Sequence, residues 1–173
     1  YPSGAFTQSG AGGSFVGTGY TFYTSSMKDH SLWSWGRNDE GQLGQNGSVN
    51  AFLSSPVQIG SKTNWIDLAD HSSNCDHFAA INSDGELWVW GNNNEGQLGD
   101  DSVVDKSSPV QIPGTTWSQD PEAIDMTNRY SVAIKTDGTL WSWGYNGYGE
   151  LGQNNRTQYW SPVQVGSDST WSK

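Results

Sequence analysis

The chain has 173 residues, a formal net charge of −10 and only 8 Lys and Arg residues, yet it contains 10 Trp and 22 Gly residues. So few scattered cations argue against binding to a nucleic-acid backbone, and no apolar run approaches the roughly 18 residues of a membrane-spanning helix. The single cysteine, Cys75, cannot form an internal disulfide and predicts a small, partly buried thiol. Abundant Trp and Gly together predict short strands, packed through large aromatic side chains and joined by tight turns.

The first part of the chain has no regular pattern. Residues 1–22 contain six Gly residues at irregular spacing, which predicts a linker or an irregular first segment. Residues 20–26 predict a degenerate strand ahead of Leu32.

From residue 23 onward four short motifs recur in a fixed order, at intervals of 52 to 55 residues. The first is Leu-Trp-x-Trp-Gly, which begins at Leu32, Leu87 and Leu140. The second is Gly-x-Leu-Gly, which begins at Gly41, Gly96 and Gly149. The third is Ser-Pro-Val-Gln, which begins at Ser55, Ser108 and Ser161, and a single Trp marks the fourth position at Trp65, Trp117 and Trp171. This order predicts three copies of one structural unit.

Each motif indicates a strand or a turn. The two Trp of the first motif are two residues apart, so on a strand both point to one face while Leu and the middle residue point to the other. The Asp-Gly pairs at 84–85 and 137–138 precede two of these strands and predict two-residue hairpin turns. Pro56, Pro109 and Pro162 are predicted to open short strands.

Each period therefore holds four short strands, of the types found at 65–68, 77–81, 87–90 and 110–112. Four-stranded antiparallel units that repeat at this period predict an all-β fold, a β-propeller of which about three blades are present. We expect repeats at about 23–60, 61–113 and 114–166, with the start of a further repeat at 167–173.

These motifs resemble those of the regulator of chromosome condensation repeat family. The family run Gly-x-Leu-Trp-x-Trp-Gly-x-Asn-x-x-Gly-Gln-Leu-Gly matches residues 85–99 throughout, whereas the third copy has Glu150 in place of Gln and the first has His30 in place of the leading Gly. The resemblance implies a propeller that usually closes as seven blades. We therefore expect a partial propeller or part of a larger one, either an excerpt of a longer polypeptide or an arc completed by other copies.

The sequence offers little for catalysis or for cofactor binding. His71 and His77 lack further ligands at metal-binding spacing, and the loop 92–96 lacks the alternating carboxylates of a calcium loop, so we expect a hydrogen-bonded turn there. No carboxylate pair or nucleophile motif recurs between the copies. We predict that the chain is not an enzyme, has no catalytic residues and binds neither metal nor cofactor.

The positions that break the repeat are the best candidates for binding. Tyr145 and Tyr148 stand where the other copies have Arg37 and Glu40, or their counterparts in the second copy. Tyr159 and Trp160 likewise replace smaller residues. Because Tyr and Trp offer rigid contact area with a polar tip, these four form the predicted binding set. The alternative is that they pack against the neighbouring blade.

Composition and motifs together favour a non-enzymatic structural or binding propeller that recognises a protein or a surface glycan through its loops. A virion appendage or decoration component, or a bacterial extracellular scaffold, is the first expectation, in contact with other copies or other subunits and with neither nucleic acid nor membrane insertion. The alternative is guanine-nucleotide exchange or protein inhibition by a propeller of the same family, with a cytoplasmic location. Sequons at Asn46 and Asn155 leave glycosylation open.

Overall fold

The computed structural model describes residues 16–18, 22–26, 30–47, 52–71, 75–121 and 123–172. Most of the predicted irregular segment 1–22 thus lies outside the described residues. The described residues form thirteen strands and no helix, so none of them provides a helix that could cross a bilayer. The predicted all-β class is confirmed.

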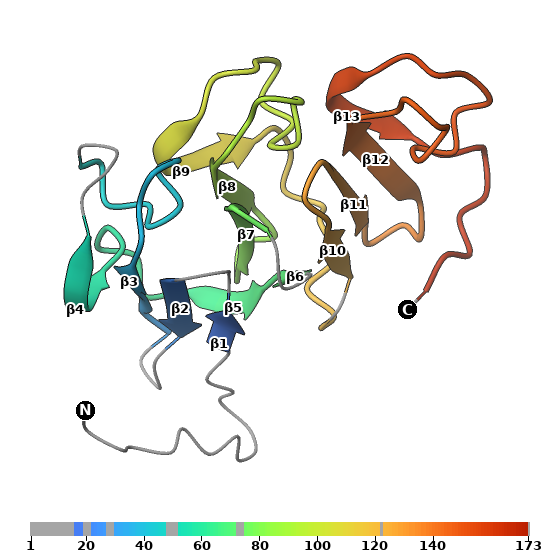
Figure 1. Cartoon of the computed structure of the whole chain (residues 1–173). Helices are drawn as coiled ribbons and strands as arrows, with labels where there is room; N and C mark the ends of the chain where they lie inside the picture. The colour runs from blue at the N-terminus through green and yellow to red at the C-terminus, as the bar shows by residue number, and fades with distance from the viewer. Residues whose placement is uncertain are drawn as a thin grey trace.

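The strands form three sheets, which lie side by side in an arc (Figure 1). Blade 1 consists of β1 (Val16–Thr18), β2 (Phe22–Ser26), β3 (Leu32–Gly36) and β4 (Leu53–Gln58). Blade 2 consists of β5 (Trp65–Leu68), β7 (His77–Asn82), β8 (Leu87–Gly91) and β9 (Lys106–Ile112). Blade 3 consists of β10 (Ile124–Met126), β11 (Tyr130–Ile134), β12 (Leu140–Gly144) and β13 (Tyr159–Gln164), and β6 (Asp70–His71) extends it.

Within each blade, neighbouring strands are antiparallel. The exception joins two blades, because β6 leaves blade 2 and pairs in parallel with β10, with Asp70 opposite Asp125. Blades 2 and 3 are thus linked by backbone pairing between β6, which follows β5, and the edge strand β10.

Two local predictions are wrong. The Asp-Gly turns are three-residue loops, since the Asn82 N–H donates to the Glu86 carbonyl at 3.2 Å and Gly85 has a φ of 72°; a glycine at that position closes this loop type. Pro56, Pro109 and Pro162 do not open strands but lie inside β4, β9 and β13. In β4 the register shifts opposite Ser34 and Gly36. A proline is tolerated there because β4 is an edge strand and the bulge needs no ladder N–H.

The cores lie between the blades, and the Leu-Trp-x-Trp-Gly strands supply both sides of them. Trp88 and Trp90 pack toward blade 1, against Leu32, Leu43 and Ile59. Leu87 and Val89, from the same strand, pack toward blade 3 with Trp143 and Ile112. The predicted alternation of faces is therefore confirmed.

The Gly-x-Leu-Gly turn of one blade holds the second Trp of the next blade. Trp90 Nε1 donates to the Gln42 carbonyl at 3.0 Å. A Cβ atom added to Gly44 would lie 3.1 Å from the Trp90 ring, and one added to Gly41 would lie 2.8 Å from Ser107 Cα. Both glycines therefore allow the close approach of blade 2. We call the junction between two successive blades a seam: the first lies between blades 1 and 2, and the second lies between blades 2 and 3.

Candidate functional site

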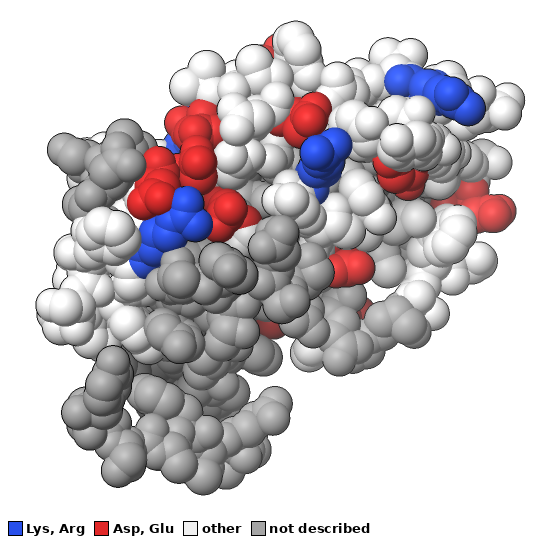
Figure 2. Space-filling view, viewed as in Figure 1, with Lys and Arg blue, Asp and Glu red and all other residues white. Residues whose placement is uncertain are grey.

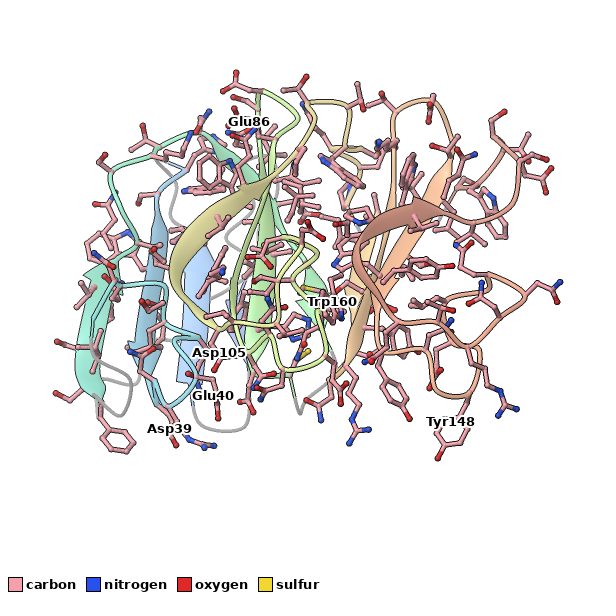
Figure 3. The ribbon with its side chains drawn as sticks, turned by 90° about the horizontal axis from the view of Figure 1, so that it is seen from above. Asp39, Glu40, Glu86, Asp105, Tyr148 and Trp160 are labelled. Carbon is pink, nitrogen blue, oxygen red and sulfur yellow. The ribbon has the colours of Figure 1, made fainter. Side chains whose placement is uncertain are left out.

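Three long loops lie on one side of the arc, and we call their surface the loop face. They follow the Leu-Trp-x-Trp-Gly strands, and their described residues are 37–47, 92–105 and 145–158. Asp39, Glu40 and Tyr148 lie along this side of the molecule, whereas Glu86 lies on the opposite side (Figure 3). The loop face is where side chains that differ between the three copies come together.

A buried asparagine shapes each loop. Asn93 accepts from the Leu98 N–H at 2.9 Å and donates to Asp100 Oδ1 at 2.9 Å and to the Ser102 carbonyl at 3.0 Å. In blade 3 Asn146 likewise accepts from the Leu151 N–H and donates to the Asn155 carbonyl, and in blade 1 Asn38 accepts from the Leu43 N–H. These side chains replace backbone partners inside the loop, so the loop at 92–96 is a hydrogen-bonded turn as predicted.

Acidic side chains gather where blades 1 and 2 meet on the loop face. Asp39 and Glu40 come from the first loop, Asp105 from the second and Asp76 from the segment before β7. Burial raises the pKa of Glu40, and the hydrogen bond and charge of Asp105 raise it further. Burial also raises the pKa of Asp76, and the only nearby cation, among the described residues, is Arg37, which is paired with Asp39.

Figure 2 views this face directly and shows acidic atoms concentrated over the junction of blades 1 and 2. Carboxylates that share so little positive charge are electrostatically unfavourable by themselves. We call Asp39, Glu40, Asp76 and Asp105 the acidic cluster. Sequence reasoning missed it, because its members come from two blades and stand at different phases of the repeat.

One repeat position faces the next blade at every seam. Glu40 meets Asp105 across the first seam, and Glu95, its counterpart, accepts from Gln158 Nε2 at 2.7 Å across the second. Tyr148 is the counterpart of both in blade 3, where it is 84% exposed. Its exposure therefore marks the open side of blade 3 as well as the loop face.

Of the four predicted binding residues, the structure brings two together. The rings of Tyr145 and Tyr148 meet edge to face, with their centroids 6.3 Å apart. The Arg129 guanidinium lies 5.2 Å from the centre of the Tyr145 ring, so that Tyr145 is half-buried beneath it. This pair offers an exposed aromatic edge beside a cation.

Tyr159 and Trp160 lie elsewhere, at the start of β13. The Tyr159 hydroxyl accepts from Asn155 Nδ2 at 3.0 Å. Trp160 covers Gly96 of blade 2, and its carbonyl accepts from the Asp101 N–H at 2.8 Å. Trp160 is still 46% exposed, so it is a seam residue with one free face. The role of all four residues in binding stays a prediction.

Cys75 and His77 form a buried polar chain between blades 2 and 3. The Cys75 thiol is fully buried and donates to the Thr127 carbonyl at 2.9 Å, while His77 Nδ1 lies 3.6 Å from the sulfur. Burial raises the pKa of Cys75 to about 12. The sulfur is thus a neutral thiol, which is unsuited to nucleophilic chemistry. The described residues contain no group of three or more His, Cys, Asp or Glu that could hold a metal ion.

The regulator of chromosome condensation (RCC1) repeat model matches residues 29–80, 84–127 and 137–172 of the chain, and a second model of that repeat matches residues 122–150. The chain belongs to this family. The match to the RCC1 repeat model confirms the resemblance that the sequence motifs indicated.

Curated relatives carry the same repeat in larger proteins. The ultraviolet-B receptor UVR8 of Arabidopsis thaliana is 30% identical over 82% of this chain and 31% of its own length. RUG3, a mitochondrial RCC1 domain-containing protein of the same plant, is 30% identical over 81% of this chain and 34% of its own length. The human E3 ubiquitin-protein ligase HERC2 is 31% identical over 70% of this chain but only 3% of its own length. The chain thus spans about a third of these relatives or less.

Solved structures show the same RCC1 fold. Prp20p from Saccharomyces cerevisiae superposes with a TM-score of 0.73 at 19% identity, over 90% of this chain and 39% of that chain. Human WBSCR16 superposes with a TM-score of 0.73 at 22% identity, over 92% and 39%. At these identities the likeness concerns the fold alone, and it agrees with the propeller architecture.

Proposed function

We propose that this chain is a non-enzymatic, protein-binding part of an RCC1-type propeller, and that its loop face recognises a basic protein surface. The observation that carries the proposal is the acidic cluster, in which the pKa values of Glu40 and Asp76 are raised. A cationic partner would supply the positive charge that these carboxylates lack. The exposed edge of Tyr148 next to Tyr145 adds rigid aromatic area of the kind that dominates protein interfaces.

The relatives support a protein partner without identifying it. Prp20p, the yeast RCC1, is described with its binding to Gsp1p and histones and in a complex with Kap60. HERC2 is a ligase, but the match covers a small part of it, so its activity is not carried over to this chain.

A binding measurement with a matched charge control tests the proposal. Core histones serve as the basic probe, titrated into the intact protein at about physiological salt. We expect D39N/E40Q/D105N to weaken binding at least 10-fold, and D84N/D137N, on the opposite side, to change it less than 2-fold. Equal weakening by both variants, or no histone binding by the parent protein, would contradict the proposal.

A further blade is the partner that we propose for the open side of blade 3. A Cβ added to Gly149 would meet nothing within 4 Å, whereas its counterparts Gly41 and Gly96 are covered by Ser107 and Trp160. Such a blade would come from more of the same chain or from another copy. Sedimentation of the 173-residue chain distinguishes these, because only supply by another copy predicts concentration-dependent association that Tyr148→Glu weakens.

The virion, extracellular and glycan-binding roles expected from the sequence gain no support from these relatives, which come from a plant, human and yeast. An intracellular location, the alternative expectation, fits relatives such as mitochondrial RUG3 better.

Guanine-nucleotide exchange is the second candidate, favoured by the likeness to Prp20p and its reported binding of Gsp1p. Accelerated release of labelled GDP from a small GTPase by the intact protein would support it, and an unchanged rate would exclude it for that GTPase. Protein inhibition by the same face is the remaining form of this alternative.

A further inference from the structure

A groove of about 520 Å³ runs along the seam between blades 2 and 3, and its lining includes neither the acidic cluster nor the Tyr145–Tyr148 pair. Val110, Ile112 and Pro113 of blade 2 form one wall, and Trp117, Trp141 and Pro162 of blade 3 form the other. The walls are largely apolar, and the volume is in the range of small-ligand and peptide sites.

Lys135 reaches into this groove as a cation held by aromatic rings. Its Nζ lies 3.7 Å from the centre of the Trp141 ring and 4.9 Å from that of Trp117. Among the described residues, no carboxylate lies within ion-pair distance of this ammonium. The pKa of Asp137 is lowered mainly by hydrogen bonds from Thr139, and the charge of Lys135 lowers it further.

The second cation of the groove is already neutralised. Lys106 Nζ lies 2.9 Å from Asp100 Oδ2, and that carboxylate is nearly buried. The Lys106–Asp100 pair is therefore neutral overall, which leaves Asp101 and Lys135 as the charged lining residues outside that pair.

The seam between blades 1 and 2 provides an internal comparison. Asn82 occupies the position of Lys135 there, and its Nδ2 donates to Glu86 at 2.6 Å. The cation over the Trp88 ring is Lys62, which lies 3.5 Å from the same Glu86 carboxylate. Within the described part of the chain, the first seam thus supplies a carboxylate for its lysine, and the second does not.

We propose that this groove binds an extended segment of a partner protein, with a Glu or Asp side chain against Lys135 and aliphatic neighbours against the apolar walls. The ammonium already lies against the face of Trp141, which leaves less of that ring for stacking of a sugar. Asp101 would repel a phosphorylated or nucleic-acid ligand, which carries several negative charges, more strongly than it would repel a single carboxylate. A single carboxylate between aliphatic residues matches both the charge and the walls.

Oriented nonapeptide libraries test this site on the intact protein. One library has Glu fixed at its centre and the other has Gln, with all other positions random. We expect the protein to retain the Glu library at least 10-fold better, with aliphatic residues selected next to the Glu. Lys135→Met should reduce retention to the level of the Gln library, and Lys135→Arg should restore it, because arginine keeps the charge over the rings.

Lys62→Met is the matched control, since it removes the equivalent cation from the first seam and should leave retention unchanged. Pro162→Glu adds a negative charge to the wall of the groove and should abolish retention even where Lys135→Met is too unstable to use. Equal retention of both libraries by the parent protein, or full retention by Lys135→Met or by Pro162→Glu, would overturn the proposal. Loss of histone binding by the loop-face variants would leave this result unaffected, so the two proposals fail separately.

Discussion

The indole Nε1 of Trp143 in blade 3 donates to the carbonyl oxygen of Gln97 in blade 2, at 2.9 Å. Trp90 makes the same bond to Gln42 one blade earlier. The two most distinctive sequence motifs thus meet across the seam, since Trp143 belongs to Leu-Trp-x-Trp-Gly and Gln97 to Gly-x-Leu-Gly. The donor is fully buried, so this hydrogen bond prevents an unsatisfied polar group in the core.

Gly99→Ala should destabilise the seam between blades 2 and 3. The new Cβ would lie 2.7 Å from the Trp143 ring, and Gly99 has a φ of 77°. We expect a loss of about 2–4 kcal/mol in the free energy of unfolding, from steric overlap and from the left-handed backbone. Chemical denaturation provides the measurement.

Gly152→Ala is the control for the glycine effect. Gly152 has a similar φ of 67°, but its Cβ would meet only the Val165 side chain, at 3.2 Å. We expect a cost of about 1 kcal/mol. Equal costs for the two variants would show that contact with the Trp143 ring does not decide the role of Gly99.

Trp160→Ser and Tyr148→Ser should separate packing from exposure. Trp160 covers Gly96 and is half-exposed, so Trp160→Ser should cost about 1–2 kcal/mol of stability. Tyr148 is 84% exposed, so Tyr148→Ser should change stability by less than about 0.5 kcal/mol. Thermal unfolding followed by circular dichroism checks both, and a large loss for Tyr148→Ser would place it in the core.

The Glu40–Asp105 contact should make stability depend on pH. The pKa of Glu40 is raised above its usual 4.5 in the folded protein. The contribution of this carboxyl group to stability is therefore fully present below pH 4.5, and it is lost as the pH rises through the raised pKa. In Glu40→Gln the amide N–H can donate to Asp105 at any pH, whereas Glu40 must be protonated to donate. We expect the variant to be more stable at pH 7 by about 0.5 kcal/mol, since the site is partly exposed to solvent.

Glu95→Gln controls for the simple loss of one negative charge from an acidic chain. It retains a partner in Gln158, so its gain at pH 7 should be smaller and should not follow the pH profile of Glu40→Gln. Identical profiles for both variants would argue for a general charge effect. Urea denaturation between pH 4 and pH 8 supplies the comparison.

Cys75 should resist alkylation in the folded protein. The pKa of its thiol is raised to about 12 and the side chain is fully buried, so almost no accessible thiolate exists at pH 8. We expect iodoacetamide to label Cys75 only when urea unfolds the chain, as intact mass measurements would show. Rapid labelling of the folded protein would indicate local opening between blades 2 and 3.

The repeat itself predicted much of the fold. The spacing of the Trp residues identified strands β3, β8 and β12, and their alternation identified which side chains face each neighbouring blade. The loop types were less predictable, because an Asp-Gly pair allows both two-residue and three-residue hairpins. Only the Asn82 to Glu86 hydrogen bond distinguishes them.

The candidate sites followed the repeat less closely. Tyr145 and Tyr148 were recognisable as departures from the repeat, and the structure brings them together. The acidic cluster was not recognisable, because Glu40 and Asp105 are 65 positions apart and meet only through the seam. The sequence likewise could not tell that Lys135 lies over Trp141 without a carboxylate partner.

The sequence by itself determined the blade, because strand alternation, turn glycines and buried Trp residues depend on neighbours within one repeat. Tertiary structure alone decided what lies at each seam, where residues from successive repeats meet. Packing two sheets face to face brings together side chains that no local pattern relates. One seam therefore brings the carboxyl groups of Glu40 and Asp105 together, and the other places the cation of Lys135 over Trp141.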